Sequence, residues 1–234
     1  MEMLSLIHGD RVRAGIFADV VAERGHTLEE WSSAWEEPLP RPLDDYGAVL
    51  VFGGAMHADQ VDHHPWLREE NLILQRLLHL GTPVLGVCLG SQLLARAAHA
   101  DVYPAREPEV GWLPVEVTDD GAQDPVLAGL PRRFDAFQWH YHAHNIPAGG
   151  TELARSDICT QAFRLGENVW GVQFHPEVTL AQVEGWVAEE PEAPIDGDAL
   201  LAQTRERMDE WNAIGRKLCG AFVEVAERAA APVG

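Results

Sequence analysis

The segment Thr82–Gln92 reads TPVLGVCLGSQ and decides how this chain folds. A short apolar run, typical of a buried β-strand, ends in Gly-x-Cys-x-Gly, and a helix-like segment follows at once. This is the pattern of a nucleophile elbow, a sharp strand-to-helix turn that presents one reactive side chain. Gly86 and Gly90 are the neighbours without side chains that such a crowded turn requires. Because the dipole of the following helix favours negative charge at Cys88, we expect Cys88 to be a catalytic nucleophile.

Strands and helices are predicted to alternate around this turn. Continuous apolar runs predict buried strands at 3–7 and 48–52, and apolar residues three or four apart predict helices at 15–24, 66–80 and 91–99. This order is typical of a flavodoxin-like α/β fold, an open, mostly parallel sheet with helices on both faces.

The pattern changes beyond residue 100, where short β-like pieces alternate with glycine and proline turns. These pieces lie at 115–117, 137–142 and 159–165, and a last, strong strand is predicted at 169–174. They predict a small antiparallel β extension joined to the parallel sheet. Apolar spacing then predicts two more helices, at 179–189 and at about 198–230. We therefore expect a single domain over 1–234, with a core at about 3–189 and a C-terminal helix.

Length and charge narrow the functional classes. The chain has 234 residues, 46% of them hydrophobic, which suits one large domain with a sizeable core. Its formal net charge of -20 argues against binding to nucleic acid or to an anionic membrane surface. No apolar run approaches the length of a membrane span, and the short apolar N-terminus lacks the basic lead-in of a signal peptide. These features predict a cytoplasmic protein.

The three cysteines are odd in number and widely spaced, which argues against a disulfide framework and favours a reducing compartment. Cys159 lies in a β-like run and Cys219 in the predicted terminal helix, so both are expected to fill the core. Trp31 and Trp35 are four residues apart and are expected to share one face of a helix.

A cysteine nucleophile needs a base, a group that orients the base, and an oxyanion hole. The run His-Pro-Glu follows the last strong predicted strand, which makes His175 the candidate base and Glu177 the candidate orienting acid. The carboxyl ends of the strands in an open α/β sheet gather in one crevice. His175 and Cys88 can therefore meet despite their distance in sequence.

An oxyanion hole needs two backbone N–H groups. The residue after the nucleophile, Leu89, is placed to supply one of them. Gly54, in the loop after the predicted strand at 48–52, is placed to supply the other, and glycine lets the backbone approach a substrate closely.

Three alternating histidines, His140, His142 and His144, would share one face of a strand. Such an alternation can indicate a metal site, but no acidic or cysteine partner stands at a suitable spacing. We therefore expect neither a bound metal nor a cofactor.

With these motifs the chain resembles the class-I (triad) glutamine amidotransferases, from about residue 3 to residue 178. The resemblance rests on three blocks: VFGGA at 51–55, PVLGVCLGSQ at 83–92 and GVQFHPE at 171–177. The segments EVGW at 109–112 and FQWH at 137–140 make the chain most similar to stand-alone domains related to the glutaminase part of GMP synthase.

This resemblance implies a reaction and further contacts. Cys88 would attack the side-chain amide carbon of glutamine, ammonia would leave, and water would hydrolyse the γ-glutamyl thioester. Gln92, one helical turn past the cysteine, matches the family position that contacts bound glutamine. The run His140, Tyr141, His142 aligns with the loop that helps to hold the amino-acid end of the substrate.

Two departures from the family pattern leave the exact substrate open. Ala55 stands where proline is usual, and Tyr141-His142 replaces Gly-Asp, so a histidine stands where an acid would read the substrate ammonium. One candidate function is a glutaminase that releases ammonia for a partner or acceptor, such as a separate synthetase subunit. The second is a stand-alone γ-glutamyl amidase or peptidase with the same triad, and the third is a catalytically idle regulatory or partner-binding domain. An intact triad favours the first two.

Overall fold

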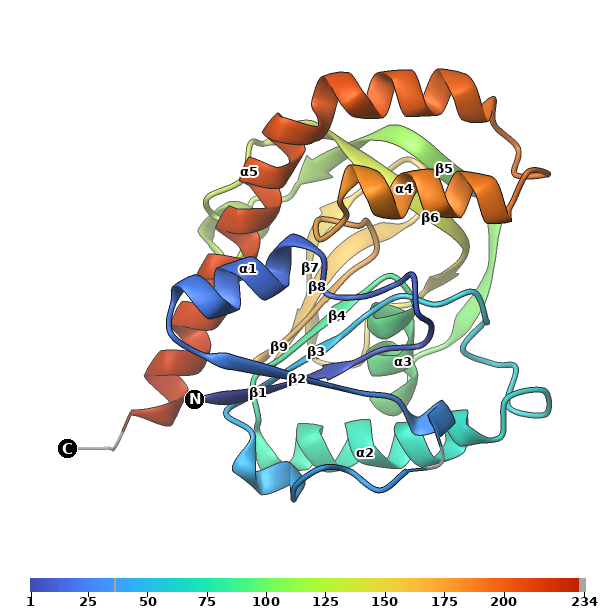
Figure 1. Ribbon diagram of the computed structural model, residues 1–234. Helices are drawn as coiled ribbons and strands as arrows, with labels where there is room; N and C mark the ends of the chain where they lie inside the picture. Colours follow the sequence, from blue (N-terminus) through green and yellow to red (C-terminus); the bar gives the residue numbers. More distant parts are fainter. Residues whose placement is uncertain (36, 232–234) are drawn as a thin grey trace.

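The computed structural model describes residues 1–35 and 37–231, and a nine-stranded sheet carries the fold (Figure 1). The strand order across the sheet is β2-β1-β3-β4-β9-β8-β7-β5-β6. The strands are β1 (Glu2–Leu6), β2 (Thr27–Trp31), β3 (Ala48–Val51), β4 (Val84–Val87), β5 (Val102–Val117), β6 (Arg133–His144), β7 (Gly150–Arg155), β8 (Thr160–Leu165) and β9 (Val169–Val172).

Five neighbouring strands, β2, β1, β3, β4 and β9, run parallel, and four antiparallel pairings then join β8, β7, β5 and β6 to them. Strands β3, β4 and β9 are buried along their whole length because helices cover both faces of the sheet. The predicted flavodoxin-like α/β fold with an antiparallel extension is confirmed. The extension is larger than predicted, since β5 and β6 pair along most of their length.

The helices form two layers. They are α1 (Ile16–Glu23), α2 (Trp66–Leu80), α3 (Leu89–Ala97), α4 (Leu180–Glu189) and α5 (Gly197–Ala230). Helices α1, α4 and α5 lie on one face of the sheet, and α2 and α3 lie on the other (Figure 1). Each layer encloses its own apolar core, one around Phe17 and Trp211 and the other around Leu74 and Leu93.

Among the described helices, none combines the length and the apolar character that crossing a membrane requires.

At the sheet's polar edge, one strand was not predicted and one sequence prediction fails. Thr27–Trp31 is an edge strand, and its half-buried Thr-Leu-Glu-Glu-Trp composition lacks the apolar run that marks a central strand. Trp31 ends that strand and is buried, whereas Trp35 lies in a short 3₁₀ turn and is 44% exposed. The two tryptophans therefore do not share a helix face.

Candidate active site

Cys88 lies between β4 and α3 in a strained backbone conformation. Its φ of 52° and ψ of -109° are unusual for a residue with a side chain, and among the described non-glycine residues only His99 also has a positive φ. A Cβ atom on Gly90 would collide with the carbonyl of Val51, and one on Gly86 would stand 2.6 Å from the Gly90 carbonyl carbon. The two glycines are thus required by the close approach of α3 to the sheet.

His175 and Glu177 follow β9 and lie beside Cys88. His175 Nδ1 is 2.8 Å from Glu177 Oε1, and both side chains are almost fully buried. Burial lowers the pKa of His175, but the Glu177 carboxylate and the Cys88 sulfur outweigh it and raise the pKa to about 10. The sheet topology therefore gathers the three predicted triad residues, with Glu177 behind the imidazole and Cys88 facing it.

The backbone and ring of His175 are held from three other elements. Its N–H donates to the carbonyl of Phe137 on β6 at 2.9 Å, and Trp211 Nε1 on α5 donates to its carbonyl at 2.9 Å. The indole of Trp186 on α4 packs edge-on against the imidazole, with ring centroids 4.8 Å apart. The terminal helix, far away in sequence, thus fixes the position of the candidate base.

The loop that carries Gly54 is oriented by a buried histidine. His8 Nδ1 lies 3.0 Å from the carbonyl oxygens of both Phe52 and Gly53, and His8 Nε2 lies 2.7 Å from Glu70 Oε1. Burial lowers the pKa of His8, but the Glu70 carboxylate and the two carbonyls outweigh it and raise the pKa. Because the C=O and N–H of a trans peptide point in opposite directions, the Gly54 N–H points away from His8.

Sequence reasoning missed both His8 and Glu70. The available signals were a histidine directly after the first strand and a glutamate on the apolar face of α2, between Leu67 and Leu74.

A cavity of about 300 Å³ opens above Cys88. All of the predicted site residues line it except Glu177: Gly54, Cys88, Leu89, Gln92, His140, Tyr141, His142 and His175. Its other walls are largely apolar or acidic and include Met56, Trp139, Trp186, Glu189 and Glu190.

The side chains predicted to contact the substrate differ in the interactions that they already make within the protein. The Gln92 amide donates to the carbonyl of His142 at 3.0 Å and to Gln173 Oε1 at 3.2 Å, so its nitrogen is already engaged. The His142 ring stacks on that of His57 with centroids 3.8 Å apart. Burial, together with His57, lowers the pKa of His142, so this residue is neutral at pH 7.

A carboxylate that sequence reasoning missed lies at the cavity mouth. Trp139 Nε1 donates to Glu190 Oε2 at 2.7 Å, and the Tyr141 hydroxyl donates to Glu190 Oε1 at 2.9 Å. Burial and the Glu190 carboxylate raise the pKa of Tyr141 to about 12. Tyr141 therefore acts as a donor, and Glu190 brings negative charge to a wall where the family pattern places an aspartate.

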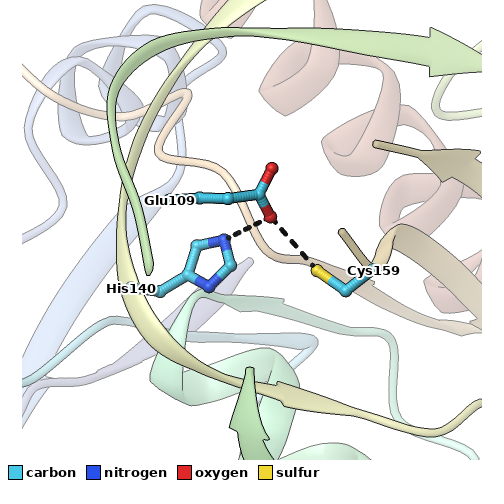
Figure 2. Close-up of side chains that lie close together, drawn as sticks. All are labelled: Glu109, His140 and Cys159. Atoms are coloured by element: carbon cyan, nitrogen blue, oxygen red, sulfur yellow. Dashed lines mark hydrogen bonds and ion pairs between the residues drawn. The ribbon is translucent and has the colours of Figure 1, made fainter. Parts of the chain in front are cut away.

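A second polar cluster lies behind the cavity wall, where Glu109, His140 and Cys159 converge (Figure 2). Glu109 Oε2 is 3.2 Å from His140 Nε2 and accepts a hydrogen bond from Cys159 Sγ at 3.3 Å. Cys159 is thus half-buried among polar groups, and the prediction that it fills the apolar core is wrong. Cys219 on α5 is fully buried in the core, as predicted.

Comparison with known proteins places the sequence and the fold in a family. The sequence model of the class-I glutamine amidotransferases matches residues 16–186. A crystal structure of a glutamine amidotransferase from Thermotoga maritima superimposes with a TM-score of 0.88 at 29% identity, covering 96% of this chain and 98% of that one.

Three related proteins have names that state different activities. A glutamine amidotransferase-like protein of Salmonella typhimurium, YfeJ, is 29% identical over 219 residues, 91% of each chain. The glutamine-hydrolysing GMP synthase of Aeropyrum pernix is 35% identical over 171 residues, which are 72% of this chain but only 32% of that protein. A γ-glutamyl-L-1-hydroxyisopropylamide hydrolase of a Pseudomonas species is 28% identical over 164 residues, 66% of this chain and 55% of that one.

Proposed function

Because this chain belongs to the class-I glutamine amidotransferase family, we propose that it hydrolyses the side-chain amide of glutamine and releases ammonia for an acceptor. The observation that carries the proposal is the arrangement of Cys88, His175 and Glu177. A strained cysteine faces an imidazole whose other nitrogen lies 2.8 Å from a fully buried carboxylate. This is the pairing of nucleophile, base and orienting group that covalent amide hydrolysis needs.

In the proposed reaction the Cys88 sulfur attacks the amide carbon and forms a tetrahedral intermediate. His175, which holds a proton because its pKa is raised to about 10, gives that proton to the departing nitrogen, and ammonia leaves. His175 then takes a proton from water, the resulting hydroxide attacks the thioester, and the C–S bond breaks. Glutamate leaves, the sulfur recovers its negative charge, and His175 keeps the proton for the next cycle.

The N–H groups of Gly54 and Leu89 are the proposed oxyanion donors. Both residues line the cavity beside Cys88, and Leu89 is the first residue of α3, whose dipole favours negative charge at that end. His8 holds the two carbonyls that precede the Gly54 N–H and so supports the orientation of this donor.

A second candidate function is hydrolysis of a γ-glutamyl amide larger than glutamine. One observation favours it: Glu190 brings a carboxylate to the mouth of the cavity, which the indoles of Trp139 and Trp186 also line. Such a mouth suits a leaving amine that is larger than ammonia and is apolar or cationic. In either case Gln92, His140 and Tyr141 are proposed to line the path of the substrate.

The two functions are separated by measuring kcat/KM for glutamine and for γ-glutamyl amides of small amines, with ammonia or amine release as the readout. We expect turnover of at least one of these substrates, its loss in Cys88→Ser, and its retention in the matched variant Cys219→Ser. Turnover that survives in Cys88→Ser would refute the mechanism.

Absence of turnover on every substrate would favour an idle domain. That result stands only if it persists when a synthetase that accepts the ammonia is added, because a partner can be required for activity.

A further inference from the structure

We propose that Glu109, His140 and Cys159 form a binding site for one zinc ion, behind the wall of the candidate active site. The three residues come from three separate segments: β5, β6 and the residue directly before β8 (Figure 2). The imidazole nitrogen, the carboxylate oxygen and the sulfur all lie within 4.8 Å of one another. The three residues are 31 and 19 positions apart in the sequence, which is not a spacing typical of metal-binding motifs. The cluster is therefore visible only in the folded structure.

The separations of the donor atoms fit a tetrahedral zinc ion. Ligand atoms about 2.0–2.3 Å from such an ion stand roughly 3.3–3.6 Å apart. Glu109 Oε2 is 3.2 Å from His140 Nε2 and 3.3 Å from Cys159 Sγ, close to these values. One carboxylate, one imidazole and one thiolate make a donor set that favours zinc over magnesium or calcium, which prefer oxygen ligands only.

The orientation of His140 is a second, independent observation. Its Nδ1 is 3.0 Å from the carbonyl oxygen of His142. Because a carbonyl oxygen only accepts hydrogen bonds, Nδ1 carries a proton and donates it to this oxygen. Its Nε2 is buried and lies 3.2 Å from the Glu109 carboxylate as an ion pair, but it has no hydrogen-bond partner of good geometry. A buried imidazole nitrogen with no hydrogen bond, beside a carboxylate and a sulfur, is what a metal ligand looks like without its metal.

The surroundings provide the hydrogen bonds that metal ligands usually receive. Gln161 Nε2 lies 2.9 Å from Glu109 Oε2 and 3.5 Å from Cys159 Sγ. Gln138 in turn donates to Gln161 Oε1 at 2.7 Å and holds that amide in this orientation. On binding, the Cys159 thiol loses its proton to solvent, and the ion takes the place of that proton between sulfur and carboxylate.

The ion would stiffen the cavity wall, since His140 lines the cavity while Glu109 and Cys159 do not. It would join β5, β6 and the β7–β8 turn at one point. The site does not depend on the proposed hydrolysis, because the triad and the cluster share no residue.

Cobalt(II) is the probe for the test, since it replaces zinc and absorbs light when a thiolate binds it. The protein is prepared without a histidine tag, reduced, and freed of metal with a chelator. It carries the background substitution Cys88→Ser so that the active-site thiol cannot bind the probe. We expect one equivalent of cobalt, with a thiolate charge-transfer band in the near ultraviolet. The band should disappear in Cys159→Ser and persist in the control Cys219→Ser.

Glu109→Gln should weaken cobalt binding by at least about tenfold, since even the hydrogen-bond partners of metal ligands are worth 10- to 100-fold in affinity. X-ray absorption of the zinc-loaded Cys88→Ser protein needs no change at the site and should find one sulfur at about 2.3 Å from zinc. Absence of the charge-transfer band, its survival in Cys159→Ser, or a zinc shell without sulfur would overturn the proposal and leave a hydrogen-bonded cluster only.

Discussion

Some residues around Cys88 can be assigned to the site from the sequence alone. Others can be assigned to it only from the folded structure. Cys88 could be predicted because a nucleophile elbow is a local pattern, and the His-Pro-Glu run because it follows a strong strand. Glu190 could not be predicted, since it approaches the cavity from the end of α4, 49 residues from Tyr141 along the chain. The Glu109–His140–Cys159 cluster escaped for the same reason.

Replacing Glu177 by glutamine tests the orienting carboxylate. Without the negative charge, the imidazolium is less stable and the pKa of His175 falls. We expect kcat to fall by about 100-fold or more with little change in KM, because the charge acts on the proton-transfer steps rather than on binding. Steady-state kinetics across pH measures this. A variant that changes KM alone would contradict the assigned role.

Replacing His8 by glutamine tests how the buried His8–Glu70 pair contributes to the free energy of unfolding at different pH values. The pKa of folded His8 is raised above its ordinary value of 6.5, so protonated His8 stabilises the folded state fully below that pH. This contribution is lost as the pH rises through the pKa of folded His8. Urea unfolding at several pH values should therefore give a difference between wild type and His8→Gln that is largest in mild acid and shrinks at alkaline pH. A difference that grows with pH would show that His8 is neutral.

At the scale of elements, prediction succeeded where one periodicity runs without interruption. Helix α2 was predicted at its observed bounds, and β3 and α1 within one residue at each end, because their apolar spacing is regular. Strand β2 escaped because an edge strand buries little, and β7 because its GTELAR sequence lacks a clear alternation. Only a fragment of β5 was predicted, because three prolines and a register shift interrupt its pairing.

Helix α5 contributes both stability and the position of the candidate base through Trp211, which is 2% exposed. Trp211→Ala should lower the free energy of unfolding by about 3–5 kcal/mol and also lower kcat, since it leaves the His175 carbonyl without its donor. Trp211→Phe keeps most of the packing but also leaves that carbonyl without a donor, so it should cost about 1–3 kcal/mol.

Urea unfolding and steady-state kinetics measure both effects, with Trp35→Ala at the 44% exposed tryptophan as the control. That control should change the free energy of unfolding by no more than about 0.5 kcal/mol. Equal losses at the two tryptophans would argue against a structural role for α5.

The whole molecule carries a net charge of -20, which opposes compact folding through self-repulsion. The many exposed ion pairs do not balance this repulsion, because each contributes only about 0–1 kcal/mol. Raising sodium chloride from low concentration to about 0.15 M, where the Debye length is about 8 Å, should therefore raise the Tm. A falling Tm in a scanning calorimeter would mean that the ion pairs outweigh the excess charge.

The proposed hydrolysis depends on Cys88 as the nucleophile toward a γ-glutamyl group. The most direct measurement is the mass of the intact protein after incubation with a glutamine analogue that carries an electrophile at the side-chain carbonyl, followed by peptide mapping. We predict a single adduct on Cys88, its loss in Cys88→Ser, and protection by the true substrate. An adduct on Cys159 or Cys219, or undiminished turnover once Cys88 is fully labelled, would contradict the account.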